Sequence, residues 1–165
     1  MQTKDNIAFI GFGSNLNNPI DQITEAFIFL QNDTNINKVQ MSSLYLSPPM
    51  GSCDQNDYIN SVAKVHTNLN YQQLHKLLKT IEKKHKKKVI STWGPRTLDL
   101  DLLSYNGIEL KSKILTIPHP GIAYRNFVII PWYEIAPDFV LPNNIKIAKL
   151  YQSCDKNIRK IKSIC

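Results

Sequence analysis

The residue types most able to do chemistry lie in the segment Trp93-Gly-Pro-Arg-Thr-Leu-Asp-Leu-Asp101. On a β-strand, where successive side chains alternate, Asp99 and Asp101 would project from the same face. Two carboxylates placed in this way can bind one or two hard divalent cations, such as Mg2+, that also take oxygens from a polyphosphate. The alternative is a strand face that is acidic by chance. Arg96 and a Gly-Pro turn stand directly before the pair in an otherwise basic chain, and this context favours the metal site.

Positive charge that could surround a polyphosphate lies just before this segment. Transfer of a phosphoryl-type group needs cations around the phosphates, a metal bridge and an acceptor hydroxyl in line, and little covalent help from the protein. Arg96 and a run of lysines could supply the cations: Lys76, Lys79, Lys83, Lys84, Lys86, Lys87 and Lys88. A solvated helix end is an equally good reading of the run, because the helix dipole favours cations there. His119, between two prolines, is either a phosphate donor or an ordinary loop histidine.

The common glycine-rich nucleotide loops are missing from the sequence. It contains neither GxxxxGK[ST] nor the glycine-rich loop of protein kinases, which disfavours both of these modes of ATP binding. The run Gly11-Phe-Gly-Ser14 lacks the rest of a dinucleotide fingerprint. On its own this run is a weak signal.

Composition limits the class of protein. With 165 residues, 42% of them hydrophobic and 20% charged, the chain should form a single domain over residues 1–165 with one core. A formal charge of +7 indicates an anionic partner, either nucleic acid or a polyphosphate small molecule. The polar start MQTKDN and the lack of a membrane-length apolar run predict a cytoplasmic protein with no membrane partner. Three cysteines without metal-ligand spacing fit free thiols.

Hydrophobic periodicity predicts the first elements that must position these residues. A buried strand over Ile7 to Phe12 is followed by a helix with Asn18 as its N-cap and Pro19 in its first turn. Alternating apolar and β-branched residues predict further strands over Lys38 to Ser47 and Tyr58 to Thr67. An apolar stripe predicts a second helix from about Asn70 to His85.

The second half of the chain continues with a strand from Thr97 to Tyr105. Its leucines, Leu98, Leu100 and Leu102, should face inward, opposite the two aspartates. The Asn106-Gly107 pair predicts a hairpin leading into residues 108–110. Residues 125–135 have a helical pattern interrupted by Pro131, and the tail from Lys146 is a weaker basic helix candidate.

The order strand, helix, strand, strand, helix, strand fits a ferredoxin-like α+β sandwich. In that fold a mainly antiparallel sheet would carry the helices packed on one face. Because the fold hosts many functions, function has to be inferred from the sites.

Five segments, in this order along the chain, resemble the motifs of the 6-hydroxymethyl-7,8-dihydropterin pyrophosphokinase family. They are Phe9-Ile-Gly-Phe-Gly-Ser-Asn-Leu16, Ser42-Ser-Leu-Tyr-Leu-Ser-Pro-Pro-Met-Gly51, Asp57-Tyr-Ile-Asn60, Trp93 to Asp101, and Ile117-Pro-His-Pro120 with Arg125-Asn-Phe127. The resemblance spans nearly the whole chain. It implies transfer of pyrophosphate from ATP to the pterin, giving AMP and the pterin diphosphate, a step of folate biosynthesis.

The resemblance also implies a role for each site residue. Asp99 and Asp101 would bind two Mg2+ ions bridging the ATP phosphates, and Asp101 could accept or orient the hydroxymethyl proton. Tyr58 and Phe127 would stack on the two faces of the flat pterin ring, and the Asn60 amide would match its amide-like edge. The remaining implied residues are Ser47, Pro48, Met50 and Trp93 toward the pterin; Glu82, Leu115, Thr116, His119 and Arg125 toward ATP; and Arg96, Lys86, Lys87 and Lys88 as catalytic cations.

Several positions depart from the family pattern. Ser47 replaces the usual Thr, and Lys86 to Lys88 replace an Arg-bearing mobile loop that is here one residue shorter. Thr92 stands in place of the Arg that usually precedes the Trp, and Ile114 in place of an ATP-side Arg that some members carry. These changes bear on turnover and ATP affinity rather than on substrate identity. The stretch from Lys83 to Trp93 is expected to close over bound substrates.

Two other functions fit parts of the same pattern. A basic ferredoxin-like module could bind RNA, but the aromatic strand motif of such modules is missing from the sequence. A nucleotidyltransferase would use the same two carboxylates and deliver AMP to the acceptor instead of releasing it. We therefore expect a monomeric enzyme whose partners are small molecules, with no nucleic-acid partner.

Overall fold

The computed structural model describes residues 5–51, 54–85 and 94–162. Its elements, in chain order, are β1 (Asn6–Ser14), α1 (Pro19–Gln31), β2 (Ile36–Met41), β3 (Leu44–Ser47), β4 (Tyr58–Thr67), α2 (Tyr71–Lys84), β5 (Asp99–Tyr105), β6 (Leu110–Lys111), β7 (Thr116–Ile117), a 3-10 turn (Ile122–Tyr124), α3 (Asn126–Ile135), α4 (Ile147–Ser153) and β8 (Arg159–Lys162). The predicted bounds of β4 are therefore correct, and those of α2 are correct to within one residue at each end.

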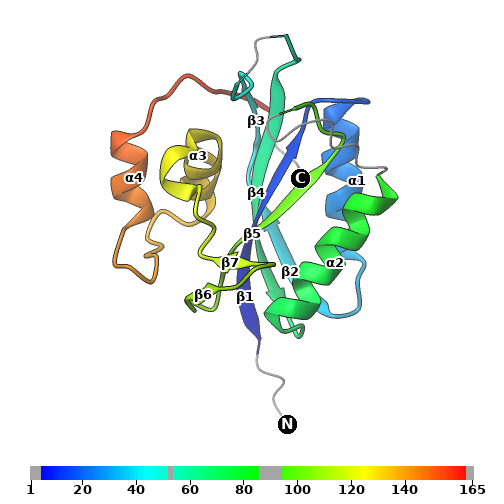
Figure 1. Ribbon diagram of the computed structural model, residues 1–165, viewed down its shortest axis with the longest axis vertical. Helices are drawn as coiled ribbons and strands as arrows, with labels where there is room; N and C mark the ends of the chain where they lie inside the picture. Colours follow the sequence, from blue (N-terminus) through cyan, green and yellow to red (C-terminus); the bar gives the residue numbers. More distant parts are fainter. Residues whose placement is uncertain (1–4, 52–53, 86–93, 163–165) are drawn as a thin grey trace.

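One antiparallel sheet holds six of the strands in the order β5-β1-β4-β3-β8, and β2 pairs with the other end of the long strand β4 (Figure 1). The prediction of a single strand over Lys38 to Ser47 was wrong, because the chain breaks between β2 and β3. At the break, the buried Ser42 accepts a hydrogen bond at Oγ from the Val62 N–H, 3.0 Å away. A side chain thus replaces part of the regular ladder.

Helices cover both faces of the sheet, with α1 and α2 on one side and α3 and α4 on the other (Figure 1). The expectation that all helices pack on one face was therefore wrong. The reason lies in the strands, where neighbouring residues such as Phe9 and Ile10 are both apolar and buried on opposite faces. Ile10 belongs to the core beneath α1 and α2, and Phe9 to the core beneath α3. The α+β ferredoxin-like class itself is confirmed.

Two local predictions after β5 also need correction. Asn106 and Gly107 do form a tight turn with positive φ values of 48° and 67°, but the following strand β6 pairs with β7 instead of returning along β5. The outer edge of β5 is bonded elsewhere, since the Leu103 carbonyl accepts from the His119 N–H at 2.9 Å. The second correction concerns Pro131, which was expected to interrupt the helical pattern. It lies inside one continuous helix, α3.

The N-terminal ends of the two predicted helices α1 and α2 are capped differently. Asn70 caps α2 with a capping box in which its side chain and that of Gln73 each accept a backbone N–H. Asn18 precedes α1 at the predicted position but has a left-handed backbone and makes no side-chain cap bond. After the short helix α4, the basic tail adds the strand β8 to β3, an element that the sequence pattern did not predict.

A carboxylate near the end of α3 fastens this helix to the sheet. Glu134 accepts hydrogen bonds from the Ser43 N–H (2.9 Å), the Ser43 hydroxyl (2.8 Å) and the Tyr45 hydroxyl, and Lys160 Nζ lies 3.7 Å away. Partial burial raises the pKa of Glu134, but these hydrogen bonds and the Lys160 charge outweigh it, so that the pKa lies below its ordinary value. The ionised form therefore stabilises the folded protein.

We expect Glu134→Gln to lower the free energy of unfolding by about 1.5–3 kcal/mol at neutral pH, the range for hydrogen bonds to charged groups. Because the pKa is lowered on folding, the stabilisation is present above the ordinary glutamate value and is lost as the pH falls through the folded value. Urea unfolding at a series of pH values should show the difference from wild type shrinking below about pH 4. Glu109→Gln, at an exposed position, is the control. An equal loss of stability in both variants, or a loss independent of pH, would refute the role of Glu134 in fastening α3 to the sheet.

Candidate active site

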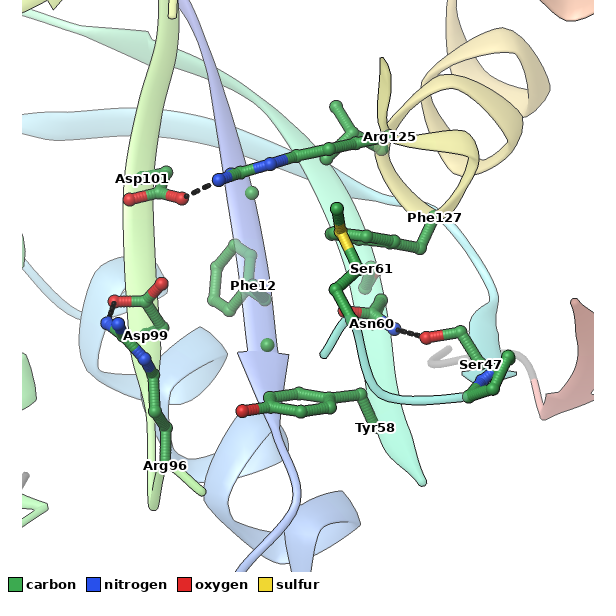
Figure 2. A pocket seen from close by; sticks show the side chains of 15 residues that line it. Phe12, Ser47, Tyr58, Asn60, Ser61, Arg96, Asp99, Asp101, Arg125 and Phe127 are labelled. Carbon is green, nitrogen blue, oxygen red and sulfur yellow. Dashed lines mark hydrogen bonds and ion pairs between the residues drawn. The ribbon is translucent and has the colours of Figure 1, made fainter. Parts of the chain in front are cut away.

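A pocket lies on the α3-facing side of the sheet, where β5, β1 and β4 run side by side (Figure 2). Further along the same face, Phe9, Val62 and Leu103 form the core beneath α3. The pocket begins where β1 carries Gly11 and Gly13 instead of large side chains. A Cβ at Gly13 would lie 3.4 Å from Asn60 Oδ1. Glycine thus leaves the floor open for a ligand to approach the backbone.

The two carboxylates stand together on one wall of this pocket. Asp99 is in register with Gly13 and Asp101 with Gly11, and both side chains line the pocket. Asp99 Oδ1 lies 3.2 Å from Arg96 Nη1, and Asp101 Oδ2 lies 3.4 Å from Arg125 Nη1 (Figure 2). The side chains are 24% and 27% exposed, so each carboxylate still has access to solvent and ligand. The structure thus places the pair on one face, as the spacing predicted.

Burial and mutual repulsion change the protonation of this cluster. Burial raises the pKa of Asp101, the negative charge of Asp99 raises it further, and His119, Lys79 and Arg125 act in the opposite direction without cancelling the rise. Asp101 is therefore a better proton acceptor than an ordinary aspartate.

His119 faces the cluster as a neutral imidazole. Burial lowers the pKa of His119 below its ordinary value despite the nearby Asp101. The Gly121 N–H donates to His119 Nδ1 at 3.0 Å, which leaves the ring proton on Nε2. That nitrogen lies 3.8 Å from Asp101 Oδ2. His119 therefore offers one N–H donor beside the carboxylate.

The opposite end of the pocket is aromatic and amide-bearing. Figure 2 shows the rings of Tyr58 and Phe127 on either side of a gap, with Asn60 between them. Asn60 Nδ2 donates to Ser47 Oγ at 2.6 Å, and the Tyr58 hydroxyl donates to the Gly94 carbonyl at 2.7 Å. Pro48 and Met50 complete this end. A flat, partly polar ring fits such a slot.

The donor set in the pocket fits a hard divalent cation. In the described segments, no group of three His, Cys, Asp or Glu side chains gathers that could enclose a metal ion. Mg2+ commonly binds through one or two carboxylates and fills its remaining positions with water and substrate phosphates. Asp99 and Asp101 alone are therefore a suitable protein contribution.

Some predicted residues lie away from this pocket. Four described residues are not among those lining it: His119, whose Nε2 lies 3.8 Å from Asp101 Oδ2; Glu82, buried on α2; and Leu115 and Thr116, next to and in β7. Four others, namely Trp93, Lys86, Lys87 and Lys88, fall outside the described residues. The structure therefore brings together the predicted pterin-side residues other than Trp93, together with Asp99, Asp101, Arg96 and Arg125.

Asn15 supports residues of the site, although the motif analysis did not single it out. It is buried at the end of β1, where its Oδ1 accepts from the Arg96 N–H at 2.8 Å. Its Nδ2 donates to Gln55 Oε1 (3.1 Å) and to the Asn56 carbonyl (2.9 Å), both in the segment before β4. One amide thus holds Arg96 and the segment leading to Tyr58. The sequence signals were an amide directly after a buried strand and its place in the segment Phe9 to Leu16, which resembles a family motif.

Asn15→Ala should lower the free energy of unfolding by about 1–3 kcal/mol, because it leaves the Arg96 N–H without its side-chain acceptor. Asn37→Ala is the matched control, since Asn37 also makes side-chain hydrogen bonds but is exposed. Urea unfolding of both variants measures the difference. Equal and small losses in the two would mean that the Asn15 bridge contributes little.

The comparisons with known proteins agree with this geometry. A family model described as 7,8-dihydro-6-hydroxymethylpterin-pyrophosphokinase matches residues 9–137. A 2-amino-4-hydroxy-6-hydroxymethyldihydropteridine pyrophosphokinase of Haemophilus influenzae is 43% identical over 87% of this chain and 89% of the relative. The protein of the same name from Pseudomonas aeruginosa is 36% identical over 88% of this chain and 90% of its own length.

Solved structures share the fold. The wild-type HPPK-DHPS of Plasmodium falciparum with pteroate aligns with a TM-score of 0.71 at 15% identity, over 95% of this chain and 48% of that one. A second HPPK-DHPS structure, in complex with substrates, aligns with a TM-score of 0.73 at 15% identity, over 94% of this chain. This chain spans slightly less than half of the length of each of those two chains. None of the helices within the described segments has both the length and the apolar character of a membrane span.

By the extent of the family match and the identity to full-length relatives, the chain belongs to the 7,8-dihydro-6-hydroxymethylpterin-pyrophosphokinase family.

Proposed function

We propose that this protein transfers the pyrophosphoryl group of ATP to the hydroxymethyl group of 6-hydroxymethyl-7,8-dihydropterin, a step of folate biosynthesis. The observation that carries the proposal is the division of one pocket into two ends. An aromatic slot with an amide lies at one end, and two carboxylates with two guanidinium groups lie at the other. Family membership supports the same reaction.

The aromatic end is proposed to bind the pterin. Stacking of the ring between Tyr58 and Phe127 would use the faces of both aromatic side chains. Asn60, held by Ser47, offers an amide that both donates and accepts, which is the pattern required by the pyrimidine edge of the pterin. The hydroxymethyl group would then point toward Asp99 and Asp101, because they form the wall across the floor of β1 from Asn60.

The charged end is proposed to bind the phosphates. The pterin hydroxyl attacks the β-phosphorus of ATP, the bond from that phosphorus to the oxygen bridging the α-phosphate breaks, and AMP leaves with that oxygen. Asp101 accepts or orients the hydroxyl proton, in keeping with its raised pKa. Arg125 and the His119 N–H, both beside Asp101, would contact phosphate oxygens. Two Mg2+ ions, when bound by Asp99 and Asp101, would neutralise charge on the phosphates.

Further predicted contacts stay proposals. Leu115 and Thr116 would lie near adenine, beyond the outer edge of β5. Trp93, Lys86, Lys87 and Lys88 would close over the phosphates and the pterin. We infer a cytoplasmic monomer, formed by one domain over residues 1–165, that binds small molecules and no nucleic acid.

The nucleotide product tests the proposed function directly. Incubation with ATP, Mg2+ and the hydroxymethyl dihydropterin should give AMP and a pterin diphosphate. A nucleotidyltransferase would release inorganic pyrophosphate and attach AMP to the acceptor, and a simple kinase would release ADP. Either of these products, or no turnover, would refute the proposal.

Asp99→Asn and Asp101→Asn should each lower turnover by at least about 100-fold, the scale for removing a preorganised electrostatic group. Both changes keep the shape of the side chain, so circular dichroism should show an intact fold. Steady-state rates measured over a range of Mg2+ concentrations provide the test. Near-normal turnover at low Mg2+ in either variant would be inconsistent with a metal role for that carboxylate.

Tyr58→Ala and Phe127→Ala should weaken pterin binding by about 1–3 kcal/mol through lost stacking and apolar burial, and ATP binding should change far less. Tyr58→Phe is the matched control: it keeps the ring, removes only the bond to Gly94, and should keep pterin affinity within a few-fold. Calorimetry with each ligand separately measures both effects. Equal losses for pterin and ATP would indicate damage to the fold instead of a clamp.

A further inference from the structure

The strand that carries the two carboxylates lies at the edge of the sheet. On its inner side β5 pairs with β1, where Asp99 and Asp101 are in register with Gly13 and Gly11. Leu100 stands between the aspartates, and its side chain is fully buried in the core beneath α2. On an edge strand, every second residue turns its N–H and C=O away from the sheet, where no neighbouring strand pairs with them.

Two side chains of α2 bind both of these backbone groups of Leu100. The Leu100 N–H donates to Glu82 Oε1 at 2.8 Å, and the Leu100 carbonyl accepts from Lys79 Nζ at 3.3 Å. Lys79 Nζ also lies 2.9 Å from the same Glu82 oxygen. The pair therefore replaces a missing strand at the residue between the two carboxylates.

The contact with Glu82 is well shielded from water. The Glu82 side chain is 4% exposed and that of Lys79 is 37% exposed. A buried carboxylate that accepts a backbone N–H makes a strong, charge-assisted hydrogen bond, and its charge requires a partner, which Lys79 supplies. Lys79 and Glu82 are one helical turn apart, so α2 presents both groups to β5 as a rigid unit.

We propose that Glu82 and Lys79 are positioning residues for the carboxylate pair. They fix the β5 backbone at Leu100 and thereby hold Asp99 and Asp101 at the spacing and direction required to bind a divalent cation together with ATP. They act through the strand and not by touching the substrates. The inference rests on the proposed function in that Asp99 and Asp101 are taken as the metal-binding groups, and it gives Glu82 a role different from contact with ATP.

Binding of Mn2+ in place of Mg2+ tests this without any turnover. Mn2+ is titrated into protein and ATP, with no pterin present, and followed by electron paramagnetic resonance. Glu82→Gln keeps the shape of the side chain but loses the charge, and it should raise the Mn2+ dissociation constant about 10-fold, the lower end for loss of an outer-shell partner. Lys79→Gln should raise it several-fold, and the double variant less than the product of the two effects, because the residues form one unit.

Two controls separate positioning from other effects. Lys38→Ala removes an exposed cation from β2, which pairs with the end of β4 away from Asn60, and should leave Mn2+ binding unchanged. ATP binding measured in EDTA, without any divalent cation, should also be unchanged in Glu82→Gln. If Glu82→Gln fails to fold, as judged by circular dichroism, Lys79→Gln carries the same test.

An unchanged Mn2+ constant in the folded variants would overturn the inference. So would an equal loss of ATP binding in EDTA, because Glu82 would then contact the nucleotide itself. The proposed function has a separate failure: wild-type protein that binds Mn2+ with ATP but forms no AMP would refute the pyrophosphoryl transfer and leave the positioning role standing. Wild-type protein that forms AMP, beside a Glu82→Gln variant with normal Mn2+ binding, would refute the positioning role alone.

Discussion

One face of three neighbouring strands has to serve both as hydrophobic core and as binding pocket, and the pleat of the sheet determines how. Along this face of β1, Phe9 belongs to the core beneath α3, whereas Gly11 and Gly13 leave the pocket floor open. Along the same face of β5, Leu103 belongs to this core, whereas Asp101 and Asp99 line the pocket. Because the side-chain period is two, a slip of one residue would exchange the carboxylates for buried leucines. The register of β1 with β4 and β5 is thus the constraint on which the site depends.

Electrostatics adds a second requirement, because two carboxylates on one wall repel each other. The structure meets it with one guanidinium for each acid, and the two come from different parts of the fold. Arg96 precedes β5 and is held by Asn15 at the end of β1, while Arg125 precedes α3. The second pair therefore depends on how α3 is docked, and Glu134 fixes the other end of that helix to the sheet. Stability and site geometry are linked through this helix.

Local pattern was sufficient to predict the elements whose bounds are set by their own residues. β4 and α2 lie where alternation and an apolar stripe place them, and the same reasoning placed Asp99 and Asp101 on one face. The errors concern contacts between distant segments. The break between β2 and β3 depends on Val62 and on Glu134, which is 91 residues from Ser43. The pairing of β8 with β3 is a tertiary contact that its basic composition does not reveal.

The residues that hold the site differ in kind from those that face the ligand. Asn15, Glu82 and Glu134 all bind backbone groups of other segments, at the three places where regular sheet pairing stops: the end of β1, the outer edge of β5 and the break before β3. Backbone groups at such places need partners when they are shielded from water. The buried Asn15 and Glu82 and the partly exposed Glu134 supply hydrogen bonds at these places, and we infer that the site depends on them as well as on the residues that line it.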